Sequence, residues 1–176
     1  MMKALTNCRN DKAFAEILAI IEEYLLKQDD LQSKFIAQFL PFCGSGEESN
    51  IWEKNRLTII KESAESDIPE AQYLVGCEEY ENRQYKKAVE LYRKSAEKGH
   101  PPSLYCLGLA YYHGQGIQCD KQKGFDFIKL AAGQLYDLAL EWLITHYKNN
   151  ESERATEQIE FYSNMLLWSE ENDFIL

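Results

Sequence analysis

Three side chains near the middle of the chain are of types that bind metal ions. His113 lies between Cys106 and Cys119 in the sequence, and thiolate and imidazole groups are common ligands of zinc. Structural zinc sites commonly hold two of their thiolates in a Cys-x-x-Cys pair, which is missing around these residues. We therefore expect neither a metal site nor cofactor-binding residues in this chain.

The glycine-rich segment Gly114-Gln115-Gly116 could in principle hold a phosphate group. A phosphate-binding loop of this kind follows a β-strand and opens a helix, so that backbone N–H groups converge on the anion. Here the segment joins two predicted helices and no strand precedes it. The pattern favours a turn whose glycines adopt positive φ.

The sequence offers no convincing set of catalytic residues. Ser and Cys nucleophiles with a matching His and carboxylate are not visible, and the pair Glu78-Glu79 is typical of an ordinary helix surface. We expect no catalytic residues and no enzymatic activity. A hydrolase acting on cell-wall or glycan material is therefore a disfavoured alternative.

The composition is that of a globular chain with an acidic balance. The 176 residues are 45% apolar and carry a net charge of −10, which argues against nucleic acid as a partner. No run of about 18 apolar residues is present to span a membrane, and no signal peptide is evident. The cysteines are odd in number and irregularly spaced, which favours reduced thiols in the cytoplasm. They are Cys8, Cys43, Cys77, Cys106 and Cys119.

A stretch of the chain repeats itself. Residues 95–112 match residues 63–80 at an offset of 32 residues, and a third copy follows at an offset of 36. The matched positions include Ser63-Ala64-Glu65 with Ser95-Ala96-Glu97, Pro69 with Pro101, Tyr80 with Tyr112, and Tyr92 with Ile128. Self-similarity at this period indicates stacked units of two helices, each unable to bury its apolar face alone.

Apolar spacing predicts helices throughout and no strands. The loop 44–50 separates two N-terminal helices from the repeats. The expected helices are 11–27, 31–40, 51–65, 69–80, 85–98, 102–113, 122–133, 138–148 and a last one ending at Trp168. Asp30 and Asp120 are the expected N-caps of the helices that follow them.

The second repeat resembles the Sel-1-like repeat, a relative of the tetratricopeptide repeat. The residues that carry the resemblance are Leu107-Gly108, Tyr111, Gly114-x-Gly116, Asp120 and Ala131-Ala132, with Ala96 to His100 matching the family's repeat ending. The resemblance covers residues 51–150 and implies an all-α, right-handed solenoid of antiparallel helix pairs. Residues 1–43 would cap one end of the solenoid, and the acidic helix within residues 151–176 would cap the other.

The repeats depart from the family pattern in two places. The first lacks the Gly-x-Gly insertion, because Asn82-Arg83-Gln84 makes a shorter turn, and the third has Ile144 where Gly is expected. Gly76 and Gly108 are interpreted as positions where a neighbouring helix approaches closely. Tyr92 and Ile128 would fill the space between the units.

The resemblance implies a protein-interaction module whose first helices line an inner, concave face. The tetratricopeptide analogy predicts that the partner protein contacts Tyr73, Cys77, Tyr80, Glu81, Tyr105, Leu109, Tyr112, His113, Glu141, Thr145 and Lys148. Tyrosines suit recognition, because each combines a large contact area with a hydroxyl group. The alternative for Tyr80 and Tyr112 is that they pack between helices.

The acidic C-terminal end suggests a second mode of binding. Residues 141–176 contain two basic and eight acidic side chains, a net charge of −6. This excess is either a solvated polar face or a docking surface for a basic partner, centred on Glu153, Glu157 and Glu160. An adaptor holding a partner in the groove is the first expectation. An immunity protein that neutralises a basic toxin domain is the alternative.

Overall fold

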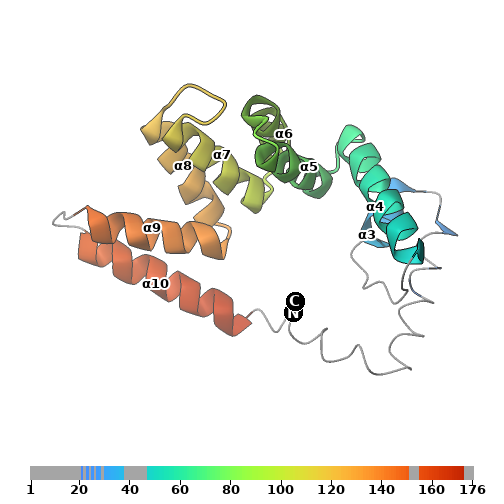
Figure 1. Cartoon of the computed structure of the whole chain (residues 1–176). Coiled ribbons are helices and arrows are strands. Elements are labelled where there is room, and N and C mark those ends of the chain that lie inside the picture. Colours follow the sequence, from blue (N-terminus) through green and yellow to red (C-terminus); the bar gives the residue numbers. More distant parts are fainter. Residues whose placement is uncertain are drawn as a thin grey trace. The chain divides into compact units, whose positions relative to one another are not determined.

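The computed structural model describes residues 30–37, 47–150 and 155–172, together with residues 21, 23, 25, 27 and 28. Every regular element in these ranges is a helix (Figure 1). The chain falls into two compact units, residues 1–71 and residues 72–176. The predicted helix 11–27 lies largely outside the described residues, although residues 21, 23, 25 and 27 are helical.

In the first unit, the short helix α3 (Leu31–Ala37) packs against the long helix α4 (Glu47–Glu65). The backbone N–H of Ser33 donates to the Asp30 carboxylate at 2.7 Å, which confirms the predicted N-cap. This hydrogen bond holds the pKa of Asp30 below its usual value. Phe35 and Ala37 are buried. The predicted residues 38–40 of this helix lie outside the described part.

The predicted loop at residues 44–50 is wrong in its second half, because α4 already begins at Glu47. Acidic residues favour a first helical turn, where negative charge complements the unsatisfied N–H groups. The sequence Glu-Glu at positions 47 and 48 therefore extends the helix into a segment whose Gly and Ser content suggested a loop. The predicted end of α4 at Glu65 is correct, and Asp67 turns the chain with a φ of 69°.

The second unit holds three helix pairs, in which consecutive helices reverse direction over short turns (Figure 1). They are α5 (Pro69–Glu81) with α6 (Tyr85–Glu97), α7 (Pro101–His113) with α8 (Lys121–Ala132), and α9 (Asp137–Asn149) with α10 (Ala155–Asn172). Helix α7 packs on both α6 and α8, and α9 packs on both α8 and α10. The predicted boundaries agree within one residue, except that α10 runs one turn beyond the predicted end. The arrangement is the predicted all-α solenoid.

Capping residues set the ends of the helices in the middle pair. Gly99 follows the end of α6 with a φ of 81°. Pro101 is the first residue of α7, where no backbone N–H is needed for a helical hydrogen bond. Gly114 closes α7 in the left-handed region, with its N–H bonded to the carbonyl of Ala110. The Asp120 carboxylate accepts from the Lys123 N–H at 3.0 Å and starts α8, as predicted.

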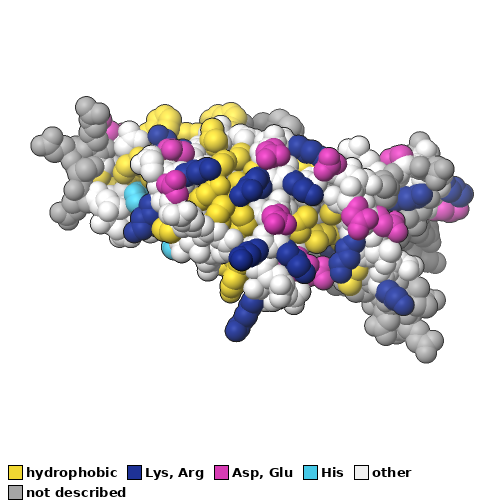
Figure 2. Space-filling model, turned by 90° about the horizontal axis from the view of Figure 1, so that it is seen from above, with side chains coloured by type: hydrophobic (Ala, Val, Ile, Leu, Met, Phe, Trp, Pro, Cys, Tyr) yellow, Lys and Arg dark blue, Asp and Glu magenta, His cyan; other side chains and the backbone are white. Residues whose placement is uncertain are grey.

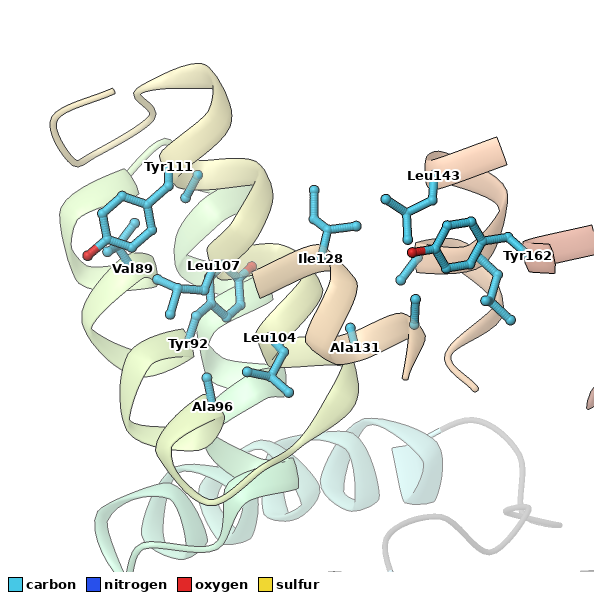
Figure 3. Packing of buried hydrophobic residues seen from close by; sticks show 14 of the residues in the cluster. Val89, Tyr92, Ala96, Leu104, Leu107, Tyr111, Ile128, Ala131, Leu143 and Tyr162 are labelled. Carbon is cyan, nitrogen blue, oxygen red and sulfur yellow. The ribbon is translucent and has the colours of Figure 1, made fainter. Parts of the chain in front are cut away.

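The core of the second unit runs continuously through the three pairs (Figure 3). Leu107, Ile128, Leu140 and Leu143 are fully buried along it. Between α6 and α7 the core contains a small polar chain, in which the Ser103 hydroxyl donates to Ser95 at 2.7 Å. The same hydroxyl lies 2.9 Å from His100 Nδ1. Because these groups satisfy one another, Ser95 and Ser103 are buried without an orphaned donor.

Candidate functional site

An open cavity of about 550 Å³ lies between helices α5 and α7. Its walls are formed mainly by aromatic rings, aliphatic groups and thiols, and its opening carries polar side chains. The lining residues are Cys77, Tyr80, Glu81, Tyr92, Cys106, Leu109, Ala110, His113 and Gln115. We refer to this cavity and its rim as the groove.

The back of the groove is shaped by a tyrosine from the neighbouring helix α6. A Cβ placed on Gly76 would lie 2.7 Å from the Tyr92 ring, so glycine leaves room for this ring in its observed position between α5 and α6. The Tyr92 hydroxyl donates to Cys77 Sγ at 3.6 Å. Burial raises the pKa of Tyr92, and the hydrogen bond to Cys77 raises it further. The hydroxyl therefore stays protonated and serves as a fixed hydrogen-bond donor.

The second thiol of the groove, Cys106, is a poor nucleophile and a poor metal ligand. Burial raises the pKa of Cys106 to about 12, with a further contribution from the neighbouring Cys77. A thiol with this pKa is almost wholly protonated at neutral pH, and it is the thiolate that acts as a nucleophile or metal ligand. Cys106 therefore contributes apolar, polarisable surface to the cavity.

The opening of the groove is held by a contact between successive repeats. The Tyr80 hydroxyl donates to Gln115 Oε1 at 2.9 Å, and its ring meets the Tyr85 ring edge-on at 5.1 Å. Tyr80 is nonetheless 38% exposed. Glu81 and His113 are exposed at the same opening. A molecule entering the cavity would pass these polar groups first.

Five of the eleven residues predicted to bind the partner line the cavity: Cys77, Tyr80, Glu81, Leu109 and His113. Tyr73 and Tyr105 are half-buried beside it. The Tyr73 ring lies 5.3 Å from the His100 ring, and the Tyr105 ring meets Tyr136 edge-on at 5.6 Å. Burial raises the pKa of both Tyr73 and Tyr105. That these residues bind a partner stays a prediction.

Tyr112 lies elsewhere, in a cluster of rings between α7, α8 and α9. Its ring meets Trp142 edge-on at 5.1 Å and lies 6.1 Å from His146, while the Lys121 ammonium lies 5.7 Å from its ring centre. This is the alternative packing role rather than a place on the cavity wall. Glu141, Thr145 and Lys148 are exposed on α9 and do not line the cavity.

The acidic residues Glu157 and Glu160 are exposed on α10, and Glu153 lies outside the described residues. The same helix exposes large apolar side chains, because Phe161 is 56% and Trp168 55% exposed. These two side chains line a second cavity of about 310 Å³. Carboxylates and apolar rings therefore share the surface of α10.

The sequence prediction missed four residues of the groove: Tyr92, Cys106, Ala110 and Gln115. Tyr92 lies on the second helix of its repeat and was assigned to packing alone. The pairing of a large ring at position 92 with Gly76 is the signal that could have placed it there. Gln115 belongs to the inserted turn, whose position depends on tertiary contacts that sequence spacing does not reveal.

Within residues 21–172, the described His, Cys, Asp and Glu side chains form no group of three able to hold a metal ion. The Cys119 thiol donates to the carbonyl of Tyr112 at 3.4 Å. Among the helices that the structure describes, none combines the length and the apolar character needed to cross a membrane.

Solved structures match this fold. One is a protective antigen of uropathogenic Escherichia coli with an SLR fold, which aligns with 88% of this chain and 36% of its own at a TM-score of 0.62 and 24% identity. The other is a Sel1 repeat protein from Oxalobacter formigenes, which aligns with 66% of this chain and 51% of its own at a TM-score of 0.51 and 18% identity. The chain is a Sel1-like repeat solenoid.

Curated proteins that match this Sel1-like solenoid are much longer than the matched segment. An uncharacterized protein of Neisseria meningitidis serogroup B is 37% identical over 78 residues, covering 43% of this chain and 17% of the relative. An exopolysaccharide production negative regulator of Rhizobium leguminosarum bv. viciae is 36% identical over 76 residues, 43% of this chain and 27% of the relative.

A third relative is chitin synthase regulatory factor 3 of Schizosaccharomyces pombe. It is 30% identical over 93 residues, which are 47% of this chain and 10% of the relative. The chain thus spans less than a third of the length of each of these relatives. No family model matches the chain.

Proposed function

We propose that this protein is a non-enzymatic interaction module that binds a partner protein in the groove and takes an apolar side chain of that partner into the cavity. The observation that carries the proposal is the cavity itself, with about 550 Å³ of space between α5 and α7. An apolar interior with a few polar groups at its edge is the usual composition of a recognition pocket.

The chemistry of the cavity favours binding over catalysis. The Cys106 thiol is protonated, and Tyr92 is committed to a hydrogen bond with Cys77. Two of the relatives are named as a negative regulator and a regulatory factor, and regulators commonly act by binding. The match to short segments of these proteins supports a binding unit within a larger regulatory context.

The charges at the opening favour a basic residue next to the apolar one. Glu81 is exposed at the rim. A Lys or Arg adjacent to a Leu, Met or Phe in the partner would place its cation against this carboxylate. Such rim charges mainly set the rate and specificity of association, whereas the buried anchor sets the lifetime of the complex.

A pair of matched substitutions tests the groove. Leu109→Glu places a charge in the cavity, whereas Leu130→Glu makes the same change on α8 at a leucine that is already 56% exposed. Partners recovered from the source cells on immobilised wild-type protein should be lost with Leu109→Glu and retained with Leu130→Glu. Equal recovery by both variants, with helical spectra intact, would place the binding surface outside the groove.

A second candidate, an inhibitor of a basic toxin domain, draws on the surface of α10. There Glu157 and Glu160 lie on the same helix as the exposed rings Phe161 and Trp168, a combination that suits a cationic, partly apolar partner. In that case Glu157→Gln with Glu160→Gln should slow association and flatten its salt dependence. An unchanged association rate would argue against this candidate.

A further inference from the structure

A third cavity, of about 250 Å³, lies on the other side of α7 from the groove residues named above, between the second helices of the first two repeats. Its floor is apolar and is formed by Leu107 and by Tyr111, whose ring stacks on Phe127 at 5.7 Å with planes 13° apart. Two cations reach it from different helices, Arg93 from α6 and Lys123 from α8.

The two cations lie around one tyrosine side chain. Tyr111 is only 8% exposed, and the Lys123 ammonium lies 4.5 Å from its ring centre. The hydrogen bond from Lys123 lowers the pKa of Tyr111, and the charge of Arg93 lowers it further. Arg93, Lys123 and Tyr111 therefore share one cavity and act on one another electrostatically. Neither of them forms an ion pair with any side chain within the described ranges.

The surroundings of this cavity are basic in an otherwise acidic chain. Residues 83–133 contain nine basic and four acidic side chains, a net charge of +5, whereas the whole chain carries −10. Helix α7 contributes none of these basic residues, so they lie on α6, on α8 and in the adjoining turns. Figure 2 shows a face on which Lys and Arg side chains gather around apolar side chains, with acidic ones between them.

We propose that this cavity is a second recognition site, which binds the carboxylate of an Asp or Glu in an acidic segment of a partner protein and packs the neighbouring apolar side chain on Phe127. The planar guanidinium of Arg93 suits bidentate binding of a carboxylate. Tyr111 and Lys123 line the same cavity and supply further donors. This site is separate from the groove and does not depend on it.

Glu97 sets the charge of the preferred ligand. It lines the same cavity as Arg93 and Lys123, so the three side chains sum to a single positive charge. A monoanionic carboxylate neutralises the cavity, whereas a phosphate dianion would leave an excess of negative charge. The interspersed acidic residues, Glu90 and Asp126 among them, and the charge of the whole chain disfavour long polyanions such as nucleic acid or an anionic membrane.

A defined peptide tests this site in the full chain. The probe is a fluorescent, terminally blocked hexapeptide in which Glu alternates with Leu and Phe, and its control has Gln in place of each Glu. Anisotropy should show binding of the Glu peptide and not of the Gln peptide. Arg93→Gln, Lys123→Gln and Tyr111→Phe should each weaken binding, the first two by about tenfold.

Matched variants and ligands decide the outcome. Lys94→Gln removes an exposed cation of α6 outside the cavity and should leave affinity unchanged, while Glu97→Gln should tighten binding. An equal loss with Lys94→Gln would mean diffuse attraction and would overturn the proposal. So would tighter binding of a phosphoserine peptide, loss of binding in Leu109→Glu, or failure of the Glu peptide to bind folded protein.

Discussion

The first two repeats use the same plan, yet their helices meet through different atoms. In the first, a Cβ on Gly76 would meet the Tyr92 ring. In the second, a Cβ on Gly108 would lie 2.7 Å from Ile128 Cγ1 and 2.8 Å from the carbonyl oxygen of Gly124, and one on Gly124 would lie 2.6 Å from the carbonyl oxygen of Gly108. Two glycines face each other where α7 crosses α8, so backbone meets backbone there. In the first repeat, α5 meets α6 through the Tyr92 side chain, which can shift.

The turns of the two repeats differ in length and in the residues that adopt positive φ. The short turn of the first places Arg83 at a φ of 61°, a conformation that costs a residue with a side chain some free energy. The longer turn of the second uses Gly114 and Gly116 at 74° and 73°. A Cβ on Gly116 would meet the backbone of Tyr85. The insertion therefore packs against the start of α6 and connects the second repeat to the first.

The largest expected effect is at the glycine crossing. Gly108→Leu should destabilise the protein by about 3 kcal/mol or more, since its methylenes must displace the Gly124 carbonyl as well as the Ile128 side chain. Gly76→Ala should cost less than Gly108→Ala because the Tyr92 ring can shift. Denaturant unfolding measures both differences. Gly133→Ala is the control: a Cβ there meets its nearest atoms at 3.4 Å, so stability should hold. Equal losses at positions 76 and 108 would contradict the comparison.

The next effect is at the inserted turn. Gly116→Ala should cost about 1–2 kcal/mol from the positive φ alone, with an added loss from the contact with α6. Arg83→Gly, in the shorter turn, should cost little, because relief of the positive φ offsets the entropy of glycine in the unfolded chain. Thermal unfolding of the two variants, followed by circular dichroism, compares the turns. A stable Gly116→Ala would mean that the insertion does not pack on α6.

The sequence predicted the repeat positions that are bound to backbone geometry. The sequence patterns identified Gly108 through its match with Gly76 at the offset of 32, and Asp120 and the Gly-x-Gly turn through their capping and turn conformations. They missed Gly124, although it matches Ala88 of the first repeat at the offset of 36, since a lone glycine within a helix has no local explanation. Its role depends on how closely two helices cross, which is a tertiary quantity.

The groove was predicted in part for the same reason. Five of the predicted positions on α5 and α7 line the cavity, and their role in binding stays a prediction. Tyr112 was assigned to the partner-binding surface from its position in the repeat alone. Its ring instead packs edge-on against Trp142 of the third helix pair. The early start of α4 was missed because Gly44 and Gly46 outweighed the helix-forming glutamates after them. In each case a contact or a competing local preference decided the outcome.

A smaller effect is expected at the helix starts. Asp120 caps α8 with a hydrogen bond to the Lys123 N–H, whereas Gln84 precedes α6 without a side-chain cap. Asp120→Ala should cost about 1 kcal/mol, and Gln84→Ala should change stability little. Urea unfolding of both variants measures the contrast. Equal stabilities would mean that the cap adds nothing to α8.

The smallest effect concerns pH. Burial lowers the pKa of His146, which stacks on Trp142 at 5.0 Å. The unfolded chain therefore binds a proton more readily than the folded one, so stability rises with pH through this window. Acidification below about pH 6.5 should progressively remove the contribution of His146. His146→Phe should flatten this part of the pH profile. An unchanged profile would show that the imidazole is equally solvated in both states.

Site-specific photocrosslinking tests the central claim, that the groove binds a partner protein, most directly. A benzophenone amino acid placed at His113 samples the opening of the groove. The same group at Glu97 and at Phe161 samples the basic cavity and the α10 surface. Position 113 should crosslink to a partner segment that contains an apolar residue beside a Lys or Arg, and excess Leu109→Glu protein should not compete for it. Crosslinks to the partner from position 161 with none from position 113 would contradict the claim.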